Sequence, residues 1–167
     1  RTQQNPTKAI YSFIVDGKQI PQFASVSRIG RNDEGHLFGY QRPEVQDHIN
    51  EIRTYLEQDD AILPNSIVIA FQKGLNFDEI SKVDDSSSIG TLRIQLLEEE
   101  KPGWIVDGQQ RVAALRSVKK EHLPVSVIGF ESDGSAEERE QFVLVNSTKP
   151  LPKSLVYELL PKIEGHI

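Results

Sequence analysis

The order of apolar and polar positions predicts strands that alternate with helices. Residues Tyr11 to Val15 alternate apolar with polar and end at Asp16-Gly17, and a second strand-like run follows from 20 to 29. An Asp-Gly step between two such runs predicts a β-hairpin. Residues 30–39 are polar and glycine-bearing, which predicts a loop, and residues 72–90 are interpreted as an insertion or long loop with room for an edge strand. Further strands are predicted at 66–71, 91–97, 104–106 and 124–130.

Helices are predicted where apolar residues recur every three or four positions. The first opens at Pro43 and ends before Asp59, with His48 packed on its apolar face. A second runs from about 109 to 120. A third is predicted to start at a capping box formed by Ser135 and Glu138 and to run to about Val145, and a last helix starts at Pro152. The sequence therefore predicts an α+β fold with a mixed sheet. The apolar residues expected inside it are Val45, Ile49, Ile52, Tyr55, Leu56, Phe142, Val143, Val145, Leu155, Val156, Leu159 and Leu160.

Composition narrows the possible chemistry. The chain has 167 residues, no cysteine and a net charge of −6. The missing cysteine excludes disulfides, thiolate metal sites and a cysteine nucleophile. No apolar run reaches the roughly 18 residues of a membrane span, so a cytoplasmic protein without membrane contact is expected. An acidic domain binds phosphate backbones poorly, so contact with DNA requires a local basic patch, another part of a longer protein or partner subunits. Because methionine is absent even at position 1, residues 1–167 are interpreted as a single domain cut from a longer chain.

The segment with the most chemistry follows the buried strand at 104–106, where the chain reads Asp107-Gly108-Gln109-Gln110-Arg111 and continues as a helix. Unpaired N–H groups at a helix start attract phosphates, and glycine permits close approach of a ligand. Amides and a guanidinium add hydrogen-bond donors, and the aspartate is suited to hold Mg²⁺ or orient water. In a purely structural alternative, Asp107 is the helix cap, Gly108 is the turn residue and the other side chains are solvated. Judged on these residues alone, strings of this kind more often have the structural role than a functional one.

This string resembles the DGQHR/DGQQR family of the ParB/sulfiredoxin-like superfamily. Further matches occur in the same order at 39–43, 63–68 and 145–151. This arrangement is similar to the B proteins of DNA phosphorothioation (Dnd) and 7-deazaguanine DNA-modification (Dpd) clusters. Gln110 stands where the family often has histidine, and it resembles the glutamine form of a group of restriction NTPases, which favours nucleotide binding.

The resemblance implies a ParB/sulfiredoxin-like mixed sheet flanked by helices, which binds ATP or a related nucleotide with Mg²⁺ and hydrolyses it. Such a protein would serve a bacterial DNA-modification or defence system together with other modification proteins, with 7-deazaguanine insertion favoured. Gly108 and the helix start would hold phosphates, Arg111 would neutralise them, and Asp107 with Gln109 or Gln110 would place metal or water. The residues expected to complete the nucleotide site are Gln41, Arg42, Asn146, Thr148 and Lys149.

Two rival functions stay open. The first is a DNA-binding transcriptional regulator of a phosphorothioation-type cluster without turnover, and the second, less favoured, is a ParB-like nuclease, for which only Asp107 is placed to hold metal. Sulfinic-acid reduction is excluded because it uses a cysteine. If one site exists, segments 39–43 and 146–149 should line the same cleft. Trp104 is expected to pack in the core, and the four histidines show no metal-ligand spacing.

Overall fold

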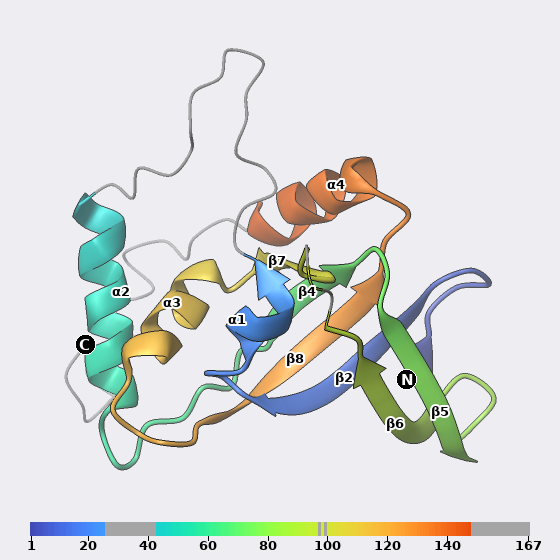
Figure 1. Cartoon of the computed structure of the whole chain (residues 1–167), viewed down its shortest axis with the longest axis horizontal. Coiled ribbons are helices and arrows are strands. Elements are labelled where there is room, and N and C mark those ends of the chain that lie inside the picture. The colour runs from blue at the N-terminus through green and yellow to red at the C-terminus, as the bar shows by residue number, and fades with distance from the viewer. Residues whose placement is uncertain (26–42, 97, 99, 148–167) are drawn as a thin grey trace, which may run out of the picture.

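The computed structural model describes residues 1–25, 43–96, 98 and 100–147, and in that part of the chain it has an α+β fold (Figure 1). A six-stranded sheet has the order β1-β2-β8-β4-β7-β3, and a two-stranded sheet pairs β5 with β6. The strands are β1 (Thr2–Gln3), β2 (Ala9–Asp16), β3 (Ala24–Ser25), β4 (Ile67–Phe71), β5 (Leu75–Lys82), β6 (Ser88–Ile94), β7 (Gly103–Asp107) and β8 (Pro124–Glu131). The helices are α1 (Ile20–Phe23), α2 (Pro43–Leu56), α3 (Gln109–Ser117) and α4 (Ser135–Asn146).

The large sheet is mixed, as predicted. β4 lies between β8, to which it is parallel, and β7, to which it is antiparallel. β2 pairs antiparallel with β8 from Ile10 to Asp16, and β3 pairs parallel with β7 at the other edge. The predicted strands at 66–71, 104–106 and 124–130 are confirmed as β4, β7 and β8, and the helices predicted from Pro43 and from about 109 are confirmed as α2 and α3.

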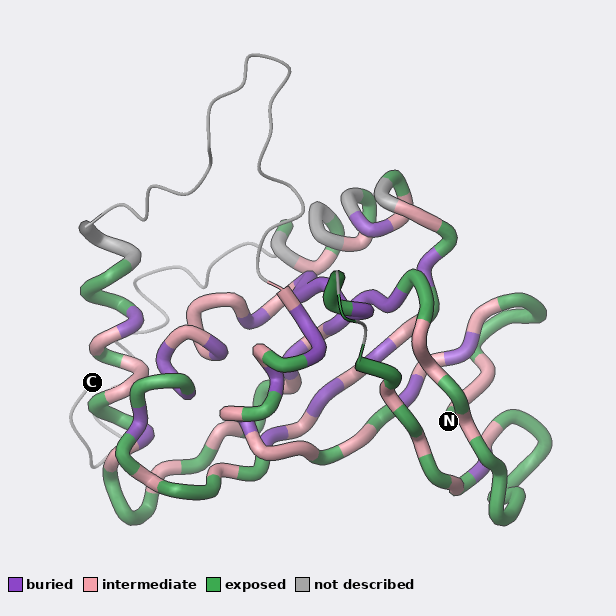
Figure 2. The backbone as a smooth tube through the Cα atoms, in the orientation of Figure 1, coloured by how far each residue is buried: buried purple, intermediate pink, exposed green. Residues whose placement is uncertain are grey.

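Each face of the sheet buries its own set of side chains, because successive residues of a strand point to opposite faces. Ile67, Ile69 and Phe71 of β4 join Ile105 in the main core, which α1, α2 and α3 cover. Ala70 joins Trp104 and Val106 in a second cluster, against which Phe130 of β8 and Val145 of α4 pack. Figure 2 shows buried positions along the central strands and exposed ones on the outer hairpin. The prediction that Trp104 packs in the core is confirmed.

The hairpin predicted across residues 11–29 is wrong. β2 ends at Asp16, but the backbone N–H of Gly17 donates to the carbonyl of Leu123 at 2.9 Å, and β2 takes β8 as its partner. The chain then forms the short helix α1, in which Pro21 stands in the first turn. Proline cannot donate to a strand ladder, whereas it suits the first turn of a helix. Only Ala24–Ser25 of the second run is a strand, and residues 26–29 lie outside the described residues, as does the loop predicted at 30–39.

Within residues 72–90 the edge strand that the sequence allowed is present as β5 at 75–82, but the segment is more regular than a long loop, because β5 pairs antiparallel with β6. The predicted strand at 91–97 is the second half of β6. A bulge between Glu79 and Ser81 and the mostly exposed side chains of β5 explain why alternation in the sequence is weak. Phe77 anchors the hairpin, because its ring lies 5.7 Å from the ring of Tyr11 on β2.

Two details at helices differ from prediction. The N-cap of α4 is Gly134, not Ser135, and the acid that reaches back is Glu137, whose carboxylate accepts the N–H of Asp133 at 2.7 Å. Because the N-cap has no side chain, the capping box predicted for Ser135 and Glu138 is wrong, and Glu138 instead accepts a hydrogen bond from the Ser132 hydroxyl at 3.2 Å. His48 is exposed beside Glu51 instead of being packed in the core. The helix predicted from Pro152 lies outside the described residues.

We expect the free energy of unfolding to depend on pH in the acid range, because of the turn after β2. Asp16 accepts the Lys18 N–H at 2.9 Å and lies 2.9 Å from His122, and these hydrogen bonds lower the pKa of its carboxyl. A carboxyl with a lowered folded-state pKa stabilises the fold above its ordinary pKa near 4, and that contribution disappears as the pH falls through the folded-state pKa. Asp16→Asn should lower the unfolding free energy by about 1–2 kcal/mol at pH 7. In urea unfolding series the difference from wild type should shrink below about pH 4, and a difference that stays constant to pH 2 would contradict the prediction.

Candidate functional site

The strand-to-helix junction is built around Gly108. Its φ of +96° lies in the left-handed region, and its carbonyl accepts the N–H of Val112 at 2.9 Å, which closes the first turn of α3. A Cβ at this position would lie 2.6 Å from Cδ1 of Ile67 on β4. Gly108 is buried, so the glycine serves the close packing of the junction on β4.

Asp107 and Arg111 form an ion pair, which we call the Asp107–Arg111 clamp. Nη2 of Arg111 lies 2.7 Å from Oδ2 of Asp107, and Nη1 donates to the carbonyls of Asn65 at 2.8 Å and Ser66 at 3.1 Å. The Arg111 side chain is only 16% exposed, and that of Asp107 33%. The clamp ties the start of α3 to the residues that lead into β4. Asp107 is therefore not the simple helix cap of the structural alternative, since α3 has no side-chain cap.

Gln109 is fixed at the same junction by its amide nitrogen. Nε2 donates to the carbonyls of Ile105 and Val106, each at 3.1 Å. Both N–H groups of the carboxamide thus bind carbonyls near the end of β7. The carboxamide oxygen is left as the group that can accept a hydrogen bond. Gln110, the next residue, is half-buried.

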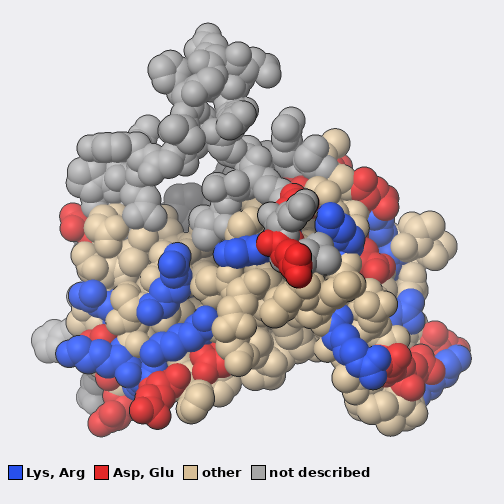
Figure 3. All heavy atoms as spheres, in the orientation of Figure 1, with Lys and Arg blue, Asp and Glu red and all other residues tan. Residues whose placement is uncertain are grey.

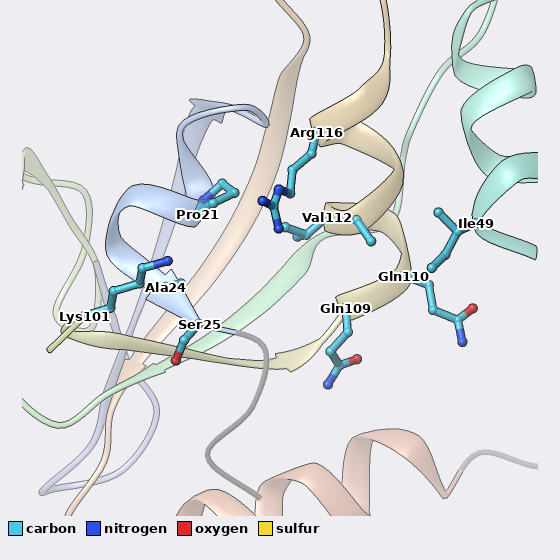
Figure 4. Close-up of a pocket in the computed structure, with 10 residues that line it drawn as sticks. Pro21, Ala24, Ser25, Ile49, Lys101, Gln109, Gln110, Val112 and Arg116 are labelled. Carbon is cyan, nitrogen blue, oxygen red and sulfur yellow. The ribbon is translucent and has the colours of Figure 1, made fainter. Parts of the chain in front are cut away.

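A pocket of about 510 Å³ lies beside α3, on the face of the sheet that α1 covers (Figure 4). That volume is within the range of small-molecule sites. One helical face of α3 forms its floor, with residues at spacings of three and four, and α1, β3 and Ile49 of α2 form the walls. The α3 residues that line it are Gln109, Gln110, Val112, Ala113 and Arg116.

The charged side chains that line the pocket in the described part of the chain are both basic, Lys101 and Arg116. Ser25 at the end of β3 adds a hydroxyl. In Figure 4, Arg116 reaches toward the α1 wall, while Gln110 and Ile49 lie on the opposite side. On the face shown in Figure 3, basic side chains gather over α3 and beside it, although the chain as a whole is acidic. The pocket therefore suits an anionic ligand that also has a hydrogen-bonding, partly apolar portion.

The structure brings some of the predicted site residues together and separates others. Gln109 and Gln110 line the pocket, whereas Asp107, Gly108 and Arg111 are not among its lining residues. Asn146 is the last residue of α4, the helix that packs against β7 through Val145, and its side chain lies outside the described residues. Gln41, Arg42, Thr148 and Lys149 lie outside the described residues, as do 39–42 of the predicted segment 39–43 and half of the segment 146–149.

Sequence reasoning missed Ser25, Ile49, Lys101 and Arg116 as lining residues. A signal for Arg116 exists, since 109, 112, 113 and 116 fall on one face of a helix. The other three come from elements far apart in the chain, and only the fold joins them.

Asp107 is the residue of the motif that is expected to hold Mg²⁺. Within residues 1–25, 43–96, 98 and 100–147, no three acidic or histidine side chains are grouped to hold a metal. Asp107 is the one carboxylate of the motif, and Arg111 occupies one of its oxygens. Mg²⁺ at nucleotide sites is commonly held by one or two protein carboxylates together with phosphate oxygens and water, so the Mg²⁺ expected at Asp107 stays a prediction. Within the described part of the chain, no helix is long and apolar enough to cross a membrane.

The fold and the site together define a class of protein: an α+β fold in which a strand–glycine–helix junction borders a basic pocket. The family model described as "DNA-sulfur modification-associated", DndB, matches residues 2–158. The chain belongs to the DndB family. No curated protein and no solved structure matches it. The expected link to DNA modification and phosphorothioation, and hence to other proteins of such a system, is thereby supported, while the place in the ParB/sulfiredoxin-like superfamily stays a prediction.

Proposed function

We propose that the chain is the nucleotide-binding component of a DNA-sulfur modification system, with ATP or a related nucleotide held in the pocket beside α3. The observation that carries the proposal is the lining of that pocket, which combines Arg116 and Lys101 with two carboxamides on one face of α3. Guanidinium and ammonium groups bind phosphate oxygens, and carboxamides bind base edges. The family description concerns sulfur, so phosphorothioation replaces 7-deazaguanine insertion as the favoured modification.

The proposal concerns binding first and turnover second. No Asp or Glu is among the pocket-lining residues in the described part of the chain, and the Asp107 carboxylate is paired with Arg111. Hydrolysis of a phosphate ester needs a group that positions water or metal in line with the leaving group. Gln109 and Gln110 line the pocket and are the groups proposed to position water, since a carboxamide can orient an attacking water. Measuring phosphate release together with binding separates a hydrolase from a sensor of the nucleotide.

Arg116→Gln should weaken ATP binding about ten- to hundredfold, the scale of one charge-assisted hydrogen bond to a phosphate. Lys119→Gln is the matched control, because it removes the same charge from an exposed position beyond α3 that does not line the pocket. Isothermal titration with ATP on both variants and the wild type measures the difference. An equal, small loss in both variants would assign ATP binding to general charge and would contradict the proposal, as would an absence of binding to the wild type.

A second candidate function is a DNA-binding regulator of the same system. It is favoured by the basic run that follows the motif, in which Arg116, Lys119 and Lys120 lie within five positions. Binding to duplex DNA through these residues would fall steeply with salt because phosphate contacts release counterions. The same three preparations, titrated with operator-length duplex at two salt concentrations, test it. In contrast to ATP binding, DNA binding should weaken in both Arg116→Gln and Lys119→Gln.

A further inference from the structure

The Gln109 carboxamide is a hydrogen-bond acceptor of fixed orientation. Its nitrogen donates to the carbonyls of Ile105 and Val106. A flipped amide would set its oxygen against these two carbonyl oxygens, so the nitrogen side is determined by the strand. Within the described residues no donor is bonded to the oxygen, and Figure 4 shows that oxygen on the Gln110 side of the pocket.

The position of this acceptor suits the base of a nucleotide rather than its phosphates. Arg116 follows Gln109 by seven positions on the same helical face, a rise of about 10 Å along α3. Val112 and Ala113 form the floor between them. A phosphate at Arg116 thus leaves space for a sugar over these small apolar residues and for a base at Gln109. A carboxamide oxygen accepts from an exocyclic amine and opposes a carbonyl oxygen.

We infer that Gln109 is a specificity-determining residue, which selects a nucleotide whose base carries an exocyclic amine over the analogue with a carbonyl at the same position. This inference rests on the proposed nucleotide site. It assigns to Gln109 a different role from that of Gln110, whose carboxamide has no hydrogen bond to β7 among the described residues. The selection is assigned to the Gln109 oxygen, which β7 holds in place before the ligand arrives. A pre-oriented polar group discriminates well, because the wrong ligand leaves it unpaired on binding.

ATP and ITP test the inference, since the two differ in the amine or carbonyl at position 6 of the purine. On the whole chain, titration calorimetry should give at least about tenfold tighter binding of ATP than of ITP, the scale of one hydrogen bond lost with a polar group left unpaired. In Gln109→Ala the ratio of the two affinities should fall to near 1. Gln110→Ala, which alters the neighbouring carboxamide, should keep a ratio close to that of the wild type.

The ratio is internal to each preparation, so a partly destabilised Gln109→Ala still gives an answer. If that variant does not fold, the wild-type ratio and the retained ratio in Gln110→Ala decide. Equal binding of ATP and ITP by the wild type overturns the inference and leaves the nucleotide site intact. A ratio that collapses in Gln110→Ala but not in Gln109→Ala transfers the selection to Gln110 and also overturns it. Binding of neither nucleotide overturns the proposed site itself.

Discussion

Gly108→Ala should destabilise the chain by about 2–5 kcal/mol, the largest effect we expect from one methyl group. Two costs add. An alanine at φ +96° costs about 1–2 kcal/mol of backbone strain. Its Cβ would also lie 2.6 Å from Cδ1 of Ile67, and such overpacking typically costs 1–3 kcal/mol. For a chain of this length the melting temperature should fall by roughly 5–15 °C, as differential scanning calorimetry would measure.

A second substitution separates the two costs. Ile67→Val removes the Cδ1 atom that the new Cβ would meet and by itself should cost about 0.5–1.5 kcal/mol. In the double variant the loss should be smaller than the sum of the single losses by about 1–2 kcal/mol. Gly134→Ala is the control for strain alone, because its φ is +149° and nothing lies within 4 Å of the added Cβ. Strictly additive losses at 108 and 67 would mean that the steric contact is relieved by other movements, contrary to the expectation.

Much of the fold could be predicted because each central strand has an unmistakable local pattern. β4, β7 and β8 are short apolar runs bounded by polar turns, and α2 carries a three-and-four spacing that begins at a proline. The failures have a common cause. The strand ends at Asp16-Gly17 as expected, but its partner is β8, more than a hundred residues away, and pairing over that distance leaves no mark on the local sequence. The β5–β6 hairpin is largely exposed, so little burial constrains its alternation.

The candidate site was predictable in its position and less so in its roles. Residues 107–111 do join a buried strand to a helix beside a pocket, as the pattern indicates. Which side chain faces which way depends on the helical phase after Gly108. That phase turns Arg111 toward the carbonyls of Asn65 and Ser66, whereas Arg116 and Gln109 line the pocket. Arg111, the arginine that the motif singles out, therefore binds groups of the protein itself, and Arg116, which the motif does not include, lines the pocket.

Arg111→Ala tests this division of roles. Its removal leaves the partly buried Asp107 carboxylate and the carbonyls of Asn65 and Ser66 without the guanidinium. Breaking a buried pair costs 3–5 kcal/mol, and because Asp107 remains 33% exposed we expect about 2–3 kcal/mol. ATP affinity, measured at a temperature where the variant is folded, should change less than threefold. The sequence alone predicts the reverse, a ten- to hundredfold loss of affinity with little change in melting temperature.

Companion variants make the result decisive. Arg111→Lys keeps the charge but lacks the planar fork that reaches three oxygens, so it should recover less than half of the lost stability. Asp107→Asn keeps an oxygen acceptor for Nη2 and should cost less than Arg111→Ala, with a coupling of about 1 kcal/mol in the double variant. If the protein hydrolyses ATP and Asp107→Asn lowers turnover a hundredfold at unchanged stability, the catalytic role that the sequence predicts for Asp107 stands instead. A clamp that only supports the fold changes stability in all three variants and leaves the rate per bound nucleotide unaltered.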